Sequence, residues 1–433
     1  MAIQTHNWSA LDEPQRDRML QRPAVADDMS IRAGTAAIID DVRRNGDTAL
    51  RRLTAEYDRA DIRDLRVTGE ELDRAENSLT SEQLDAIELA IDNVGKFHRA
   101  QIQADIRVET MQGVLCERVS HPIDAVGLYV PAGTAPLPSA AIMLAVPAKI
   151  AGCPVRVLAT PPRPDGEADP AVLVAASRAG VREMYKVGGA QAIAAMAYGT
   201  ETVPKVAKIF GPGNAWVTSA KTIVSSDPAG AAIDMPAGPS EVLVIADEYA
   251  SAEFVASDLL AQAEHGVDSQ VILVTTSFEM ATQVAGQIED QLELLSRANI
   301  ARGALENSRI IVVDDIPTAI EVSNRYAPEH LILQIKEPRR QLPQIRNAGS
   351  VFVGQWTPES VGDYCSGTNH VLPTYGFART YSGLGVDQFM RQMTVQELSR
   401  EGLANLGAAV VSLAGLEGLD AHAAAVTRRL GTS

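Results

Sequence analysis

Residues 241–275 read EVLVIADEYASAEFVASDLLAQAEHGVDSQVILVT, in which two apolar runs flank a stretch with helical spacing. Both runs are hydrophobic throughout instead of alternating with polar residues. That pattern is typical of parallel strands whose two faces are both covered. A strand, a helix and a second strand in this order indicate a β-α-β unit, the repeating element of α/β folds.

The same alternation of apolar runs and Ala-rich helical stretches extends in both directions, from about residue 125 to about residue 375. It forms two consecutive blocks, 125–235 and 238–375, which we interpret as α/β units with doubly wound parallel sheets. The expected strands are 125–130, 155–160, 205–210, 241–246, 270–276, 309–313, 330–333 and 350–353.

Outside these blocks the sequence predicts helices. Ser9 can cap a helix with Asp12 in its first turn, and Pro23 ends this N-terminal arm. Thr80 and Gln83 have the spacing of a capping box in front of an apolar stripe. After about residue 380 the strands stop, and the chain reads as two helices.

The composition excludes several classes of protein. The 433 residues carry a formal charge of −17, which is unfavourable for binding the phosphate backbone of a nucleic acid. Cys116, Cys153 and Cys365 are odd in number and far apart, which fits a reducing compartment. No signal peptide is visible, and the most apolar stretch, 140–152, is too short to span a bilayer. We expect a cytoplasmic protein that binds neither nucleic acid nor membrane.

Two glycine loops follow apolar runs and precede helical stretches, at Gly188-Gly189-Ala190-Gln191 and Gly211-Pro212-Gly213-Asn214. Such loops can direct backbone N–H groups and a helix N-terminus at an anion. The dinucleotide fingerprint GxGxxG and the P-loop are both absent from the sequence. From the residues alone, turn glycines without a ligand are the favoured interpretation.

Gln262 and His265 are three residues apart near the end of a predicted helix, so their side chains share one face. Imidazole is a good zinc ligand and an amide oxygen a weaker one. A structural histidine at a helix end is the competing interpretation. His422, in the C-terminal helices, reads by itself as a surface histidine.

Glu329 and His330 lie between Pro328 and the apolar run LIL. A carboxylate beside an imidazole supplies two groups suited to acid–base catalysis. A surface loop is the alternative. The segment 359–370 is dense in polar side chains and glycine, and Asp363 in it could supply a carboxylate to a metal.

Taken together, these segments resemble the histidinol dehydrogenase family, from about residue 25 to the C-terminus. The loop 367–374 and the tail 417–422 look like the histidinol branch of that family. The motifs that carry the resemblance are 127–133, 187–191, 211–214, 234–241, 261–265, 327–330 and 362–370.

The resemblance implies two incomplete Rossmann-like domains, a small N-terminal helical arm and a C-terminal helical tail. Residues 1–24 would form the arm, and 25–129 with 238–381 a first, discontinuous domain that carries the metal and catalytic residues. Residues 130–237 would form the second domain, on the NAD side. The tail, 382–433, would cross to the partner subunit of an intertwined homodimer.

The resemblance also implies the chemistry of the last steps of histidine biosynthesis. L-Histidinol would be oxidised to L-histidine through L-histidinaldehyde, with two NAD+ and one zinc ion per subunit. Zinc is redox-inert, so NAD would take the electrons. The implied catalytic residues are Glu329 and His330, and the implied zinc ligands are Gln262, His265, Asp363 and His422. The implied contacts with NAD are Tyr129, Gln191 and Asn214. The implied contacts with the substrate are Ser240, Gln262, His265, His330, Asp363, Glu417 and His422.

Two other functions stay open on the sequence. One is a relative within the family that oxidises another small alcohol, such as a sulfonated diol. The other is a non-enzymatic module that binds a metal or a nucleotide. The intact pair Glu329-His330 argues against the module, because a protein that only binds needs no proton acceptor.

Overall fold

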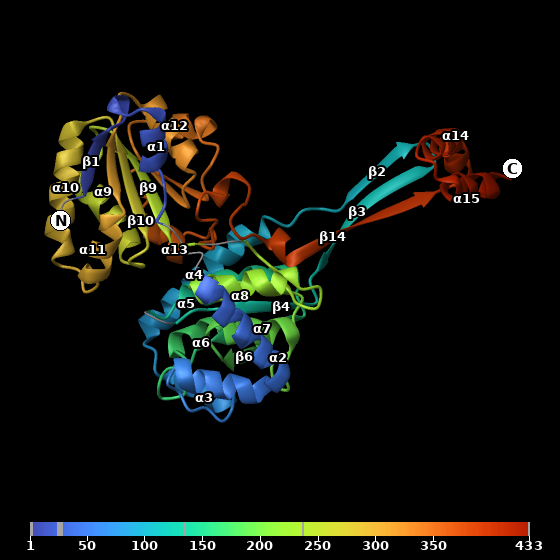
Figure 1. Cartoon of the computed structure of the whole chain (residues 1–433), viewed down its shortest axis with the longest axis horizontal. Helices are drawn as coiled ribbons and strands as arrows, with labels where there is room; N and C mark the ends of the chain where they lie inside the picture. Colours follow the sequence, from blue (N-terminus) through green and yellow to red (C-terminus); the bar gives the residue numbers. More distant parts are fainter. Residues whose placement is uncertain (1–2, 24–28, 133–134, 236–237, 432–433) are drawn as a thin grey trace.

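The computed structural model describes residues 3–23, 29–132, 135–235 and 238–431. Residues 133, 236 and 237 of the motifs above lie outside these ranges. The chain forms two lobes, each built on a parallel sheet, and a long arm that projects from them and ends in the C-terminal helices (Figure 1).

The first lobe contains a six-stranded sheet in which all neighbours are parallel. Successive residues of its strands enter two different hydrophobic clusters, one on each face, which explains the continuous apolar runs. The order of its strands is β1 (Gln4–Asn7), β11 (Arg309–Val312), β10 (Gln270–Thr275), β9 (Glu241–Ala246), β12 (His330–Gln334) and β13 (Ser350–Val353).

Helices cover both faces of this sheet. On one face lie α9 (Ala252–Ala263), α10 (Phe278–Leu292) and α11 (Ala298–Glu306). On the other face lies α12 (Ile316–Tyr326), together with apolar residues of the N-terminal segment. The short helix α13 (Glu359–Tyr364) contacts α9 beyond the last strand.

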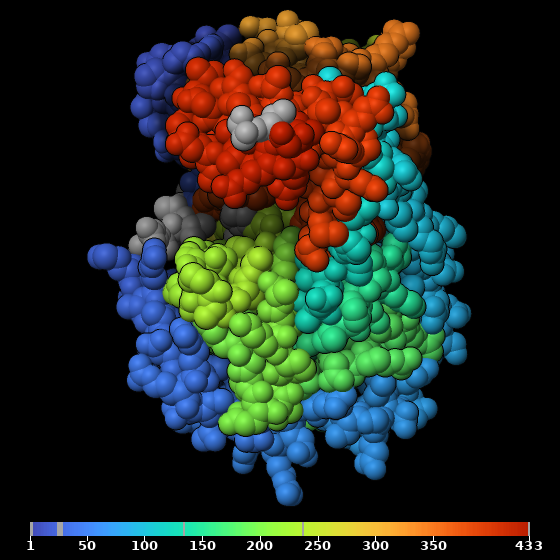
Figure 2. Space-filling model, turned by 90° about the vertical axis from the view of Figure 1, so that its right-hand side faces the viewer, coloured from blue at the N-terminus to red at the C-terminus, as the bar shows by residue number. Residues whose placement is uncertain are grey.

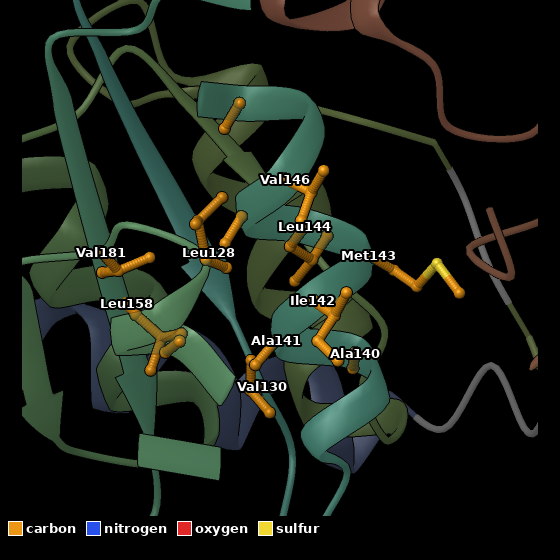
Figure 3. Close-up of a cluster of buried hydrophobic side chains, with 14 of the residues drawn as sticks. Leu128, Val130, Ala140, Ala141, Ile142, Met143, Leu144, Val146, Leu158 and Val181 are labelled. Carbon is orange, nitrogen blue, oxygen red and sulfur yellow. The ribbon is translucent and has the colours of Figure 1, made fainter. Parts of the chain in front are cut away.

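The second lobe contains a five-stranded parallel sheet. Helix α5 (Pro138–Ala151) is buried against Leu128, Val130 and Leu158 of this sheet, as Figure 3 shows. The strand order is β6 (Glu183–Lys186), β5 (Val155–Thr160), β4 (Ala125–Tyr129), β7 (Lys208–Phe210) and β8 (Ala232–Ile233), and the other helices are α6 (Pro170–Arg178), α7 (Gly189–Tyr198) and α8 (Ala215–Ser226).

The direction of winding in the second sheet reverses between β4 and β7. In open α/β sheets such a switch point leaves a crevice at the carboxyl ends of the strands, where ligands commonly bind. The predicted α/β class, with two doubly wound parallel sheets of Rossmann-like type, is confirmed.

The segment before β4 packs on the second lobe, which differs from the expected division of 25–129 with 238–381. Helix α2 (Met29–Tyr57) packs on α7 and α8, α3 (Gly69–Asn77) on α6, and α4 (Ser81–Arg99) on α5. Strand β4 is the central strand of the second sheet. An apolar stripe shows that a helix packs, but it does not tell which of two sheets receives it.

The N-terminal arm is not purely helical as expected. Residues 4–7 form β1, which adds an edge strand to the first sheet, followed by η1 (Trp8–Ala10) and α1 (Glu13–Met19). Asp12, not Ser9, caps α1: its side chain accepts the N–H of Gln15, which is a capping box. Because residues 4–7 are all polar, this segment contains no apolar run from which a strand could be predicted.

The C-terminal tail also contains a strand that the sequence did not predict. Strand β14 (Met390–Leu398) pairs antiparallel with β3 (Val114–Pro122), which pairs with β2 (Ile106–Met111). This ribbon carries α14 (Arg400–Leu416) and α15 (Asp420–Leu430) away from both lobes (Figure 1). Figure 2 looks along the arm, with these helices nearest the viewer. Three short 3-10 helices complete the described chain: η2 (Pro338–Gln344), η3 (Phe377–Arg379) and η4 (Val386–Phe389).

No helix among the described residues is both long enough and apolar enough to cross a membrane.

Candidate active site

A buried group of polar side chains lies at the amino ends of strands β9 and β12. This is the edge opposite to the one where open α/β sheets usually bind ligands. Glu329 and His330 enter the group at the start of β12, and α9 contributes its C-terminal turn. The loop after α13 links this edge to the second lobe, because the amide nitrogen of Asn369 donates to the carbonyl of Met143 in α5 at 2.7 Å.

Glu241, the first residue of β9, holds both Glu329 and His330 through its own backbone. Its N–H donates to Oε2 of Glu329 at 2.9 Å, and its carbonyl oxygen lies 3.1 Å from Nδ1 of His330. A carbonyl can only accept, so Nδ1 carries the ring proton. Nε2 of His330 is then a lone-pair nitrogen, and it is buried with no hydrogen-bond partner.

Helices α9 and α13 bring a set of metal-ligand atoms to the same place. One ligand atom each from His265, Glu359 and Asp363 lie within 4.8 Å of one another. Nε2 of His330 is 3.9 Å from Oδ1 of Asp363. His265 is exposed and Glu359 is buried, so the cluster reaches from the interior to the surface.

Gln262 lies fully buried behind this cluster. With its amide turned so that the nitrogen faces Glu359, it donates to Oε1 of that carboxylate at 2.7 Å. The same nitrogen lies 3.0 Å from Nδ1 of His330. Because Nδ1 already gives its proton to the Glu241 carbonyl, the carboxylate is the acceptor. This orientation leaves the amide oxygen of Gln262 for another partner.

Burial sets the protonation of these groups. Desolvation, reinforced by neighbouring carboxylates, raises the pKa of Glu329 and of Glu359 well above the ordinary value. Desolvation also raises the pKa of Asp363 to about 6 and lowers that of His330 to about 3. A bound cation would reverse the shifts of the carboxyls, because it favours their charged form.

The structure brings together some of the residues expected from the sequence and separates others. Gln262, His265, Asp363, Glu329 and His330 converge in one cluster of side chains, which we call the pocket, and Ser240 directly precedes Glu241 at its edge. Glu417 and His422 lie on the tail helices at the far end of the arm, exposed to solvent and remote from the pocket of the same chain (Figure 1).

Sequence reasoning missed Glu359 and Glu241. Glu359 is four residues before Asp363 in α13, and the i, i+4 spacing of two carboxylates on one helix would have been a usable signal. Glu241 acts through its backbone, and no residue-type pattern identifies such a role. His370, whose Nδ1 lies 3.0 Å from the carbonyl of Asp363, also contacts this segment.

The second lobe gathers the residues expected to contact NAD at the carboxyl edge of its sheet. The hydroxyl of Tyr129, at the end of β4, accepts the N–H of Gly189 at 3.0 Å. Gln191 is buried in the first turn of α7, whose N-terminus has no side-chain cap. Asn214 caps α8, its side chain accepting two backbone N–H groups. All three therefore border the switch point between β4 and β7.

Comparison with known proteins identifies the family. The family model described as histidinol dehydrogenase matches residues 20–430. The chain belongs to the histidinol dehydrogenase family. The histidinol dehydrogenase of Vibrio vulnificus is 56% identical over 428 residues, covering 99% of this chain and 98% of that one, and that of Vibrio cholerae is 55% identical over the same length. The crystal structure of histidinol dehydrogenase from Elizabethkingia anophelis has a TM-score of 0.95 and 46% identity, covering 99% of this chain and 98% of that one.

Membership of the histidinol dehydrogenase family over the full length confirms the family and the enzyme class expected from the sequence. The chain is an NAD-dependent oxidoreductase of histidine biosynthesis. The matched crystal structure also confirms the expected α/β architecture.

Proposed function

We propose that this chain oxidises L-histidinol to L-histidine through L-histidinaldehyde, with two NAD+ and one zinc ion per site. The observation that carries the proposal is the unpartnered, buried Nε2 of His330, 3.9 Å from Asp363 in the ligand cluster. It offers a proton acceptor next to the place where a metal would hold the substrate.

The donor atoms of the pocket fit a zinc ion. His265 and Asp363 would hold it from this chain, and Glu359 lies close enough to contribute. Gln262 would add its amide oxygen if the amide turned so that this oxygen, and not the nitrogen, faced the cluster. The buried carboxyl groups of Glu329 and Glu359 and the partly buried one of Asp363 all have raised pKa values, and a divalent cation would compensate their charge. When bound, zinc supplies a Lewis acid that fixes the donor atoms of the substrate.

The carboxyl edge of the second sheet fits a dinucleotide. Tyr129, Gln191 and Asn214 would contact NAD there, and the uncapped N-terminus of α7 is suited to a pyrophosphate. When bound, NAD+ accepts one hydride in each oxidation step.

The two catalytic side chains divide the proton transfers. Nε2 of His330 removes the hydroxyl proton of the alcohol and later that of the aldehyde hydrate, one for each hydride that leaves. Glu329 activates the water that hydrates the aldehyde. Its carboxylate oxygen is 3.6 Å from Nδ1 of His330, so both groups serve one reaction centre. Burial of the pair excludes bulk water from the reactive aldehyde.

The site is completed by a second copy of the chain. His422 would provide the fourth zinc ligand and Glu417 would pair with the substrate ammonium, each in the pocket of the neighbour. Support comes from the tail itself, because it projects from the lobes and exposes large apolar residues on α14 such as Leu413 and Leu416. On this basis the protein would be an intertwined homodimer. The proposal also includes a cytoplasmic location and contact of Ser240 with the substrate.

The test is to add histidinol and NAD+ to the full chain and follow NADH. We expect two NADH for each histidinol oxidised, and loss of this activity after chelation that added zinc restores. A sulfonated diol serves as the competing substrate. A faster reaction with the diol would assign the chain to a relative's reaction, and binding of metal and NAD without any NADH formation would indicate a non-enzymatic module.

A further inference from the structure

Arg22, in the N-terminal segment, contacts the side chain of Glu241 and the turn that precedes Glu329. Its Nε and one terminal nitrogen donate to the two carboxylate oxygens of Glu241 at 2.8 and 2.6 Å. Its guanidinium lies over the ring of Tyr326, 3.9 Å from the centroid. The Glu241 side chain is almost fully buried and also accepts the backbone N–H of Tyr375. A planar bidentate pair of this kind fixes direction as well as charge.

Arg22 also holds the turn that leads into the catalytic pair. The same terminal nitrogen donates to the carbonyls of Tyr326 at 2.9 Å and of Ala327 at 3.3 Å. Ala327 has a φ of 56°, in the left-handed region that an alanine adopts only under constraint. Two residues later the chain reaches Glu329. Arg22 therefore constrains the approach to Glu329 and His330 from one side.

Glu241 constrains the catalytic pair from the other side. Its N–H and carbonyl bind Glu329 and His330 respectively, and the carbonyl contact fixes the tautomer that leaves Nε2 of His330 free. Strands β9 and β12 are neighbours in register, with His330 opposite Val242. A rotation of the first residue of β9 would move both backbone contacts together.

We propose that Arg22 is a positioning residue, which acts through Glu241 and Ala327 to hold Glu329 and His330 in their reactive geometry. The inference rests on the proposed function. It gives the described part of the N-terminal segment, residues 3–23, an indirect effect on both oxidation steps. Small errors in the placement of catalytic groups are costly for rate, even when the substrate still binds.

The experiment uses the full-length, zinc-loaded chain and compares Arg22→Met, Arg22→Lys and the double variant Arg22→Met/Glu241→Gln. For Arg22→Met we expect kcat to fall ~10- to 100-fold in both the alcohol and the aldehyde step, with zinc content and the KM for NAD unchanged. Arg22→Lys keeps the charge but not the two-pronged geometry, so we expect a similar fall in kcat with a smaller loss of melting temperature.

The double variant separates stability from positioning. It removes the uncompensated buried carboxylate that Arg22→Met creates, so the melting temperature is expected to recover while kcat stays low. Lys186→Met is the matched control, because it leaves Glu71 unpaired in a similarly buried ion pair of the second lobe. It should lower the melting temperature and leave kcat within about threefold. Arg325→Met loosens the docking of α1 through Glu13 and Asp17 and should behave in the same way.

Recovery of kcat together with stability in the double variant would overturn the inference, as would equal losses of kcat in Arg22→Met and Lys186→Met. If Arg22→Met does not fold, Arg22→Lys and the double variant decide by the same criteria. A wild-type chain that forms no NADH from histidinol would instead overturn the proposed function and this inference with it. An active wild type with unaffected Arg22 variants would overturn only the inference.

Discussion

The pocket at the amino edge of the first sheet and the tail helices at the end of the arm are built in opposite ways. In the pocket, Gln262, Glu329, His330 and Glu359 are buried and held by backbone or by one another. In the tail, α14 and α15 contact mainly each other and expose apolar side chains. The residues that one chain supplies to the pocket are organised within that chain, whereas the tail helices expose apolar side chains that no other described residue covers.

This difference indicates which chain supplies each of the side chains that the reaction needs. The residues that one chain places in the pocket are held there by contacts within that chain. A ligand carried by an arm depends on the association of two chains. The most direct test of this difference is whether the tail completes the pocket of its own chain or that of a neighbouring copy.

The largest effect is expected from mixing two inactive variants, His330→Asn and His422→Ala. Each alone should lose nearly all activity. If the tail serves the neighbour, a mixed dimer contains one pocket with both native residues, so unfolding and refolding an equimolar mixture should restore about a quarter of the wild-type activity. NADH formation from histidinol is the measurement.

A tail that served its own chain would give no restoration, because each pocket of the mixed dimer would then carry one of the two changes. The control is a mixture of His330→Asn with Asp363→Ala, because these two residues lie in the core of the same chain and cannot complement in either arrangement. Restored activity in that mixture would show that complementation does not depend on exchange of the tail between subunits.

The next effect separates the two residues that share the Glu241 backbone. His330→Asn removes the proton acceptor of both oxidations and should lower the rate of each by ~10²- to 10⁴-fold. Glu329→Gln keeps the acceptor for the Glu241 N–H and should mainly slow oxidation of the aldehyde. Single-turnover measurements with histidinol and with histidinaldehyde distinguish the steps, and equal losses in both steps for Glu329→Gln would contradict this division.

The sequence predicted the pocket better than it predicted the architecture around it. Continuous apolar runs located both parallel sheets, and the spacing of Gln262 and His265 drew attention to the right segment. Gln262 lies in the last turn of α9, whereas His265 follows the C-cap of that helix, Glu264. Local periodicity carries this information because a helix or strand imposes it over a few residues. The role of His422, in contrast, came only from the family resemblance.

The failures involve contacts between distant segments. Arg22 and Glu241 are 219 residues apart, and no local pattern pairs them. The strand at residues 4–7 and strand β14 are mostly polar and exposed, so burial leaves no mark on their sequence. The packing of α2 to α4 on the second sheet depends on the tertiary fold, which an amphipathic pattern does not encode.

A smaller effect is expected from Glu359→Gln, which sharpens the account of the pocket. The carboxylate accepts the Gln262 amide and lies beside the ligand atoms of His265 and Asp363. Its loss should weaken zinc affinity by ~10- to 100-fold, as measured by competition with a chelator. Glu264→Gln, next to His265 but outside the cluster, is the control. Unchanged affinity in Glu359→Gln would remove this residue from the metal site.

The smallest effect concerns the destabilisation of the fold by a buried charge, a contribution that is absent where charged side chains are exposed, as in the tail. Oδ2 of Asp58, after the end of α2, is buried without a hydrogen-bond partner, and burial raises the pKa of this carboxyl to about 6. Because the folded-state value exceeds the unfolded one of about 3.9, the protonated acid stabilises the fold at low pH. That contribution is lost as the pH rises through about 6.

Asp58→Asn should therefore stabilise the chain more at pH 8 than at pH 5. A shift of about two units corresponds to nearly 3 kcal/mol at full burial, and partial exposure to solvent reduces the expected difference to about 1 kcal/mol. In a chain of this size that is a difference of about 2 °C in melting temperature between the two conditions. An equal effect of Asp58→Asn at both pH values would mean that water reaches the carboxyl in the folded chain. The charge of Asp58 would then destabilise the lobe no more than an exposed charge destabilises the tail.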